Sequence, residues 1–198
     1  MGRKRDTRNI KGDAAAGHRW ALLLVDVINE LEFDGAETLL PKARAMARRV
    51  AALKARAVKA GVPVIYVNDN FKQWRSDFRM LVDRCLHGGV RGEPIARLLA
   101  PGEDDYFVLK PLHSGFYTTT LDLLLRELGS QKLVVCGIAT EGCVLFTASD
   151  AYMRGFELFV PRDGCASESA SRHRNALDIM QKMLKADTRA CARIKFSR

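Results

Sequence analysis

The sequence has no hydrophobic run long enough to cross a membrane. The longest apolar run near its start, Trp20 to Val25, is far shorter than the roughly 20 residues that a membrane-spanning helix needs. No positively charged segment is followed by an apolar stretch of about 7–15 residues, so we expect no secretory signal peptide. These absences predict a cytoplasmic protein with no membrane partner.

The cysteines and histidines show neither a disulfide framework nor a metal-binding motif. The number of cysteines is odd, and without an export signal we expect free thiols in a reducing compartment. Cys136 and Cys143 lie close together, but no second cysteine pair or histidine pair completes a zinc site around them. The histidines are scattered at positions 18, 87, 113 and 173, where each is expected to be solvated or packed. We predict no bound metal and no cofactor.

The central part of the sequence carries no net positive charge, and the sequence has no phosphate-binding loop. Its net charge of +9 is confined to the ends, because residues 1–19 carry +4, residues 182–198 carry +5 and residues 20–181 are neutral. No basic stretch in the body is interleaved with aromatic residues, so no specific nucleic-acid partner is predicted. Neither GxGxxG nor GxxxxGK[ST] occurs, which argues against a flavodoxin-like or nucleotide-binding module.

The 198 residues do contain a regular alternation of apolar strands and amphipathic helices. Continuous apolar runs indicate strands buried on both faces, and strand–helix alternation favours a parallel sheet covered on both sides. We expect strands at 20–27, 62–68, 105–111, 132–137 and 156–163, an edge strand at 191–196, and helices at 37–59, 119–129, 140–155 and 167–185. Residues 69–92 read as an irregular loop, the kind that often carries function.

We therefore predict one α/β domain. It is a three-layer α-β-α, Rossmann-like architecture with a mostly parallel sheet of about six strands, covering residues 19–198. Residues 1–18, rich in charge with three consecutive alanines, are expected to form a basic, flexible N-terminal arm.

Three polar residues fall at the carboxyl ends of the expected strands, where open parallel sheets bind ligands. They are Asp26, Lys110 and Cys143. Taken singly, the aspartate could cap a loop, the lysine could be solvated and the cysteine could be a small buried residue. Together they suit nucleophilic catalysis, because helix N-termini and nearby cations lower a thiol's pKa. Thr140 as N-cap would place Cys143 in the first helical turn, and Asp26 would accept its proton and return it to a leaving group.

The segments "LLLVDV", "VLKPLHSGFYTTTLDLLLRELG" and "LVVCGIATEGCVLFTASDAYMRGFELFVPRDGCAS" together resemble the isochorismatase-like cysteine hydrolases, a superfamily that includes nicotinamidases and N-carbamoyl amidohydrolases. The resemblance covers about residues 20–182. It implies that Asp26 is the base, Lys110 the third member of the triad and Cys143 the nucleophile.

The resemblance also implies a particular turn before the nucleophile. In this superfamily the turn contains a non-proline cis peptide bond, which here falls between Ile138 and Ala139. That bond would aim the backbone N–H groups of Ala139 and Cys143 at the substrate oxygen as an oxyanion site.

Departures from the superfamily's patterns indicate which branch is involved. Nicotinamidases hold a metal with an aspartate and two histidines after the second strand, whereas here Asp69 is followed only by His87. This disfavours nicotinamidase activity, and the pattern "VNDN…W" is more similar to metal-free members. Isochorismatases cleave a vinyl ether without a thiol, so Cys143 favours acyl chemistry instead.

We therefore predict a cysteine hydrolase that cleaves a C–N bond of a small amide, ureido or carbamoyl substrate through a thioester at Cys143, with Asp26 then activating water. A homo-oligomer, dimer or tetramer, is expected from the resemblance. Two alternatives stay open: an isochorismatase-type hydrolase of another small molecule, and a catalytically silent α/β binding or interaction protein. The residues expected to contact substrate are Asn70, Trp74, Phe116 and Tyr117.

Overall fold

A six-stranded parallel sheet forms the centre of the protein. The computed structural model describes residues 19–70 and 77–197, so the predicted arm at 1–18 and the candidate Trp74 lie outside the described residues. The strands follow the order β3-β2-β1-β4-β5, with β6 paired to the end of β4, and all the pairs are parallel. The strands are β1 (Trp20–Val25), β2 (Val64–Asp69), β3 (Tyr106–Lys110), β4 (Lys132–Ile138), β5 (Glu157–Phe159) and β6 (Cys165–Ala166). This confirms the predicted fold class.

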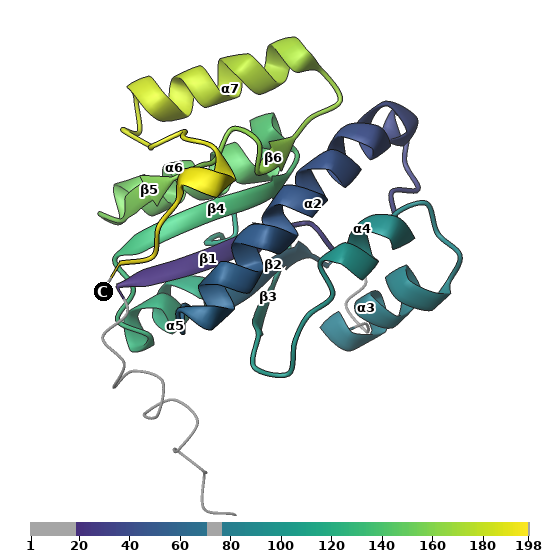
Figure 1. Cartoon of the computed structure of the whole chain (residues 1–198), viewed down its shortest axis with the longest axis horizontal. Helices are drawn as coiled ribbons and strands as arrows, with labels where there is room; N and C mark the ends of the chain where they lie inside the picture. The colour runs from purple at the N-terminus through teal and green to yellow at the C-terminus, as the bar shows by residue number, and fades with distance from the viewer. Residues whose placement is uncertain (1–18, 71–76, 198) are drawn as a thin grey trace, which may run out of the picture.

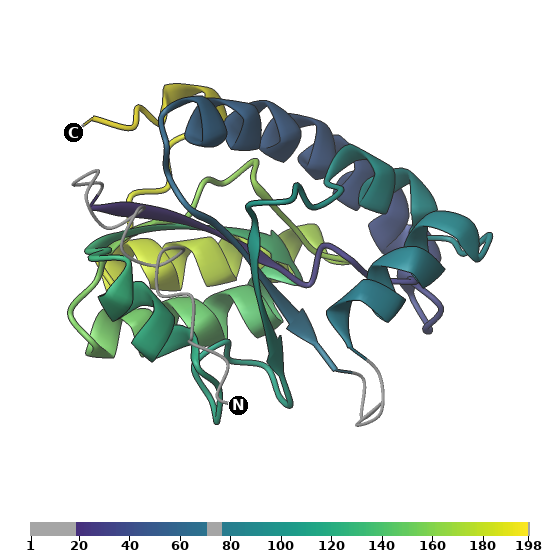
Figure 2. The same ribbon diagram turned by 90° about the horizontal axis from the view of Figure 1, so that it is seen from below.

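Helices cover both faces of this sheet. In Figures 1 and 2, α2, α3 and α4 lie over one face, and α5, α6 and α7 lie over the other. Among the described helices none is both long and apolar enough to cross a membrane. The helices are α2 (Ala36–Lys59), α3 (Phe78–His87), α4 (Glu93–Leu98), α5 (Leu121–Glu127), α6 (Leu145–Met153) and α7 (Ala170–Lys182).

The two helical layers explain why β1 is apolar at every position. Leu22 and Leu24 belong to the hydrophobic core beneath α2, whereas Leu23 and Val25 belong to the core beneath α5 to α7. All of these side chains are fully buried. A strand covered on both faces has no solvent-facing position for a polar residue, so its sequence does not alternate.

The centre of the sheet is a topological switch point, because the chain builds outward from β1 in one direction and then returns to form β4 on its other side. Residue 137 must be glycine for these two strands to meet closely. A Cβ at Gly137 would lie 1.9 Å from the carbonyl oxygen of Val25, and the glycine has a φ of +139°. Ligands of open α/β sheets bind beyond the carboxyl ends of the strands at such a point.

Two predicted elements are wrong. The irregular loop expected at 69–92 contains helix α3, which Asp77 caps by accepting a hydrogen bond from the Met80 N–H at 2.9 Å. Its buried residues Phe78, Leu81 and Cys85 have the spacing of one helical face, a signal that was available in the sequence.

The expected edge strand at 191–196 is instead a short 3₁₀ turn, η2 (Cys191–Arg193), and β6 supplies the sixth strand. The carbonyl of Cys191 accepts a bond from the Arg56 side chain at 2.7 Å, and its N–H donates to Asp163 at 2.7 Å. The apolar residues Cys191 and Ile194 are buried in the core beneath α2. Packing against a helix, rather than strand pairing, therefore accounts for the apolar pattern.

Candidate active site

The structure brings Asp26, Lys110 and Cys143 together at the carboxyl end of the sheet. Asp26 follows β1, Lys110 ends β3, and Cys143 lies in the turn η1 (Thr140–Val144) that follows β4. The ammonium nitrogen of Lys110 is 2.8 Å from Asp26 Oδ2 and 3.4 Å from Cys143 Sγ. The Lys110 side chain is completely buried and that of Asp26 is 6% exposed, so these charges meet away from bulk water.

Asp69 is a fourth member of this cluster that the sequence reasoning did not assign to the site. Its carboxylate lies 3.5 Å from the Lys110 ammonium, and its backbone N–H donates to Asp26 Oδ1 at 2.6 Å. The register of the sheet causes this, because Asp69 on β2 is paired directly with Lys110 on β3. Both carboxylate oxygens of Asp26 are thereby engaged, one by Lys110 and one by the Asp69 N–H.

Burial sets the protonation equilibria of the cluster. It raises the pKa of the Cys143 thiol to about 12, with the Asp26 carboxylate acting in the same direction and Lys110 opposing both. Burial also raises the pKa of Asp26 above its ordinary value, against the opposing effect of Lys110. For Lys110, burial alone would lower the pKa, but Asp26, Cys143 and Asp69 together raise it. At neutral pH the cluster therefore contains a cationic lysine and a protonated thiol.

The turn that carries Cys143 differs from the expected helix start. Residues 140–144 form a π-type turn, interrupted at Gly142 by a φ of −110° and ψ of −112°, and α6 begins only at Leu145. Thr140 does not cap the helix, because its hydroxyl is 2.8 Å from His173 Nδ1. The predicted lowering of the thiol pKa by a helix terminus is therefore wrong. The peptide bond between Ile138 and Ala139 is cis.

The residues expected to contact substrate occupy different environments. Asn70 is half-buried beside the cluster, and its backbone N–H donates to the carbonyl of Lys110 at 3.0 Å. Phe116 is buried in the core, where it packs against Phe156 and under the Arg154 guanidinium. Packing thus accounts for Phe116 without a substrate. Tyr117 is 54% exposed.

The loop that follows β3 is attached to α6 at successive residues. The Ser114 hydroxyl donates to the carboxylate of Asp150, and the Gly115 N–H donates to the hydroxyl of Thr147 at 3.0 Å. Thr147 is fully buried. A Cβ at Gly115 would lie 2.6 Å from a methyl group of Val67, so only glycine allows this close contact. These bonds fix the loop to α6, the helix that immediately follows the turn carrying Cys143.

This loop also carries His113, which the sequence reasoning treated as an ordinary solvated histidine. Its Nδ1 lies 3.6 Å from Cys143 Sγ, and its ring stacks on Phe146 with the ring centroids 5.3 Å apart. His113 is exposed, in contrast to Lys110 and Asp26. In the sequence, only the position of His113, three residues beyond Lys110, indicated that it could lie near the site.

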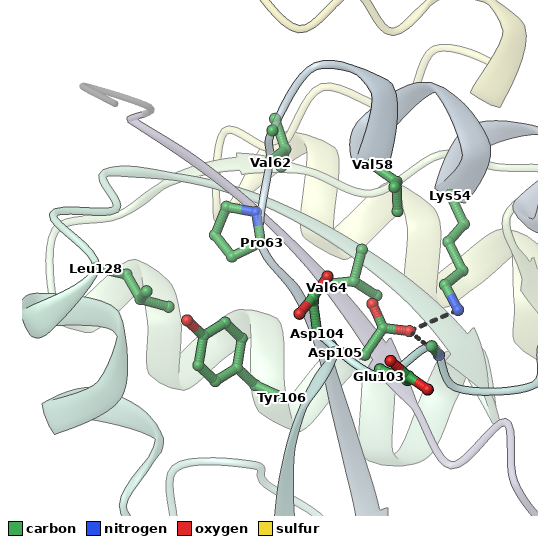
Figure 3. A pocket seen from close by; sticks show the side chains of 12 residues that line it. Lys54, Val58, Val62, Pro63, Val64, Glu103, Asp104, Asp105, Tyr106 and Leu128 are labelled. Atoms are coloured by element: carbon green, nitrogen blue, oxygen red, sulfur yellow. Dashed lines mark hydrogen bonds and ion pairs between the residues drawn. The ribbon is translucent and has the colours of Figure 1, made fainter. Parts of the chain in front are cut away.

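A cavity of about 410 Å³ lies at the opposite, amino-terminal end of the strands (Figure 3). The side chains of Val62, Pro63 and Leu128 form part of its wall, and Lys54 is held by Asp105 at 2.6 Å. Lys54 also donates to the Tyr66 hydroxyl and the Ala100 carbonyl, each at 2.8 Å. The cavity contains no thiol and is separate from the Cys143 site.

No group of three or more histidine, cysteine, aspartate or glutamate side chains within residues 19–70 and 77–197 is arranged to hold a metal ion. That the protein works without a metal stays a prediction. All five cysteines fall within these residues, all are free thiols, and Cys143 alone among them is not buried.

Comparison with known proteins identifies the family. The model of the isochorismatase domain matches residues 20–190, and the chain belongs to the isochorismatase family within the isochorismatase-like cysteine hydrolases. It is 41% identical over 167 residues to the uncharacterized isochorismatase family protein YaaI of Bacillus subtilis, covering 84% of this chain and 91% of that protein.

Two further proteins are similar to most of the chain. The chain is 28% identical over 184 residues to the probable inactive nicotinamidase At3g16190 of Arabidopsis thaliana, covering 86% of this chain and 94% of that protein. The crystal structure of N-carbamoylsarcosine amidase from Thermoplasma acidophilum is similar with a TM-score of 0.70 and 26% identity, covering 89% of this chain and 99% of that one. The family and its structural neighbours support a hydrolase that acts on a small molecule.

Proposed function

We propose that the protein is a cysteine hydrolase that cleaves the C–N bond of a small amide, ureido or carbamoyl substrate through a thioester on Cys143. One observation carries the proposal: a half-buried thiol lies 3.4 Å from the ammonium of Lys110, which in turn lies 2.8 Å from Asp26. The similarity to an N-carbamoylsarcosine amidase supports the substrate class.

Asp26 serves as the base for the thiol in this proposal. The thiol is protonated at rest, because its pKa is raised to about 12, so it must lose its proton as it attacks the carbonyl carbon. Asp26 is hydrogen-bonded to the thiol, and burial has raised its pKa, which makes it a stronger base than an exposed aspartate. General-base catalysis of this kind contributes about 10²–10⁴-fold to a rate.

Lys110 stabilises the negative charge of the buried site in this proposal. Moving a proton from Cys143 to Asp26 transfers negative charge from a carboxylate to sulfur, and the ammonium lies within 3.4 Å of both groups. The ammonium attracts the sulfur as negative charge develops on it. Few groups need to move, because the site is buried and already ordered. The N–H groups of Ala139 and Cys143 are proposed as oxyanion donors, and Asn70, Trp74, Phe116 and Tyr117 remain proposed substrate contacts.

The test measures both turnover and the covalent intermediate. We would screen small carboxamides, ureido acids and N-carbamoyl amino acids for ammonia release, and quench reactions in acid to detect an acyl adduct by mass. Cys143→Ala should lower turnover by at least about 10⁴-fold and remove the adduct, since loss of a nucleophile removes the covalent route. Cys85→Ala, which removes a buried thiol on α3, should retain the adduct.

Ammonia release that persists in Cys143→Ala would contradict the proposal. A folded wild-type protein that neither turns over any compound nor forms an adduct would favour the silent alternative. Turnover of a vinyl ether without an adduct would favour the isochorismatase-type alternative. Assembly into a homo-oligomer and a cytoplasmic location also remain proposals; the exposed apolar side chains of Phe146, Met153 and Met183 are compatible with the former.

A further inference from the structure

The Cys143 sulfur has buried neighbours and one exposed titratable neighbour. Lys110 and Asp26 are enclosed by the protein, whereas His113 approaches the sulfur from the exposed loop, with its Nδ1 at 3.6 Å. A substrate must reach the half-buried sulfur from the solvent side. The leaving group of that substrate must also depart on this side, where His113 lies.

The position of His113 is fixed rather than incidental. The two residues after it are bonded to α6, Ser114 to Asp150 and Gly115 to Thr147. Its ring also stacks on Phe146, which lies one helical turn beyond Cys143. The imidazole and the sulfur are thus held by the same segment of chain, which keeps the distance between them constant.

Hydrolysis of a C–N bond requires two proton transfers besides the loss of the thiol proton. The leaving nitrogen needs a proton, and the water that attacks the thioester must lose one. Asp26 already accepts the thiol proton, its side chain is 6% exposed, and both of its oxygens are engaged by Lys110 and the Asp69 N–H. A second acid–base group on the solvent side would relieve Asp26 of these two transfers.

We propose that His113 is that group, acting in place of Asp26 first as the acid for the leaving group and then as the base for water; the proposal rests on the function proposed above. As the S–C bond forms, the thiol proton passes to Asp26. As the C–N bond breaks, protonated His113 gives its proton to the departing amine and becomes neutral. Neutral His113 then takes a proton from the attacking water. The S–C bond breaks, and sulfur recovers its proton from Asp26, so every group ends in its starting state.

The experiment varies only the leaving group. Cys143 would be acylated in single-turnover reactions with p-nitrophenyl acetate, phenyl acetate and trifluoroethyl acetate, which share one acyl group and have leaving groups of increasing basicity. The variants are His113→Phe, which keeps a ring to stack on Phe146, and His113→Asn, which keeps a polar group. Leu112→Ala, at an exposed neighbour in the same loop, is the control.

Loss of an acid matters most for the most basic leaving group. We expect both His113 variants to acylate with p-nitrophenyl acetate within about threefold of wild type, but to lose about 10²-fold with trifluoroethyl acetate. The acetyl-Cys143 thioester, followed by mass, should also persist about 10²-fold longer in both variants because its hydrolysis lacks a base. Leu112→Ala should match the wild type in every assay.

An equal loss across the three esters would show that His113 only packs or positions the loop, and would overturn the proposal. Unchanged rates and thioester lifetimes would overturn it too. The function itself is judged separately by the wild type. If wild-type Cys143 forms no acyl adduct with even p-nitrophenyl acetate, the proposed function fails and this inference fails with it.

Discussion

Two mostly buried lysines lie at opposite ends of the sheet, and their surroundings differ in kind. At the amino end, Lys54 is held by oxygen atoms of Asp105, Tyr66 and Ala100 beside the cavity shown in Figure 3. At the carboxyl end, Lys110 faces the carboxylates of Asp26 and Asp69 and, in addition, a thiol.

The comparison contrasts an ion pair that suits a structural role with the cluster that we propose to be reactive. The oxygen partners of Lys54 satisfy it fully, so nothing there is poised to change its bonding. A thiol is a poor hydrogen-bond partner for an ammonium, and the Lys110 site contains two groups whose pKa values burial has raised. The cavity of about 410 Å³ lies at the end without the thiol, so its lining residues are not those of the Lys110 cluster.

Exchanging each lysine for methionine would test this contrast most strongly. Lys110→Met should lower acylation of Cys143 by p-nitrophenyl acetate by about 10³-fold or more, because the developing sulfur charge loses the buried ammonium beside it. It should also lower the free energy of unfolding by about 3–5 kcal/mol, since Asp26 is left buried without its partner. Lys54→Met should cost about 1–3 kcal/mol of stability by removing the cation that pairs with Asp105 and donates to Tyr66, and leave acylation within about threefold.

Rates come from single-turnover mass measurements and stabilities from urea unfolding. Losses of acylation that run in parallel with losses of stability in both variants would show that the two lysines play the same structural role, and the contrast would be lost.

A smaller effect is expected when the loop that carries His113 loses one of its hydrogen bonds to α6. Thr147→Val keeps the shape of a fully buried side chain but removes the acceptor of the Gly115 N–H, which should cost about 1–3 kcal/mol. Acylation by trifluoroethyl acetate, the ester that depends on His113, should fall by about tenfold, because a small displacement of the loop misplaces His113 relative to the sulfur. Ser149→Ala is the matched control, since that hydroxyl only donates back to the carbonyl of Leu145. Unaltered acylation in a destabilised Thr147→Val would mean that the loop position does not matter for the reaction.

The smallest effect is a shift in the titration of one thiol. The thiolate absorbance of wild type minus that of Cys143→Ser should show no step between pH 6 and about 9, because burial raises the pKa of Cys143 to about 12. Asp26→Asn removes a negative charge that disfavours the thiolate, so the step should move to lower pH. Lys110→Met removes a favourable cation, so the step should move to higher pH. A wild-type step near neutral pH would contradict the burial argument.

Local sequence patterns were enough to predict the parallel sheet and the meeting of Asp26, Lys110 and Cys143, because each of these residues lies at or just beyond a recognisable strand end. They did not identify Asp69 or His113 as neighbours of the cluster. Asp69 is placed by strand register and His113 by bonds from its loop to α6, and both are long-range facts. The raised pKa of the thiol was missed for a similar reason, because it depends on burial rather than on the helix start that local sequence suggests.

The indole N–H of Trp20, the first residue of β1, donates to the carbonyl of Ser197 at 2.9 Å. The first and last described portions of the chain are thus neighbours, both at the pole of the sheet opposite Cys143, as Figure 1 shows for the C-terminus beside the start of β1. Neighbouring portions of this kind are a favourable place to join a chain in a circular permutant. A protein attached to a support at this pole of the sheet would present the Cys143 end to the solution.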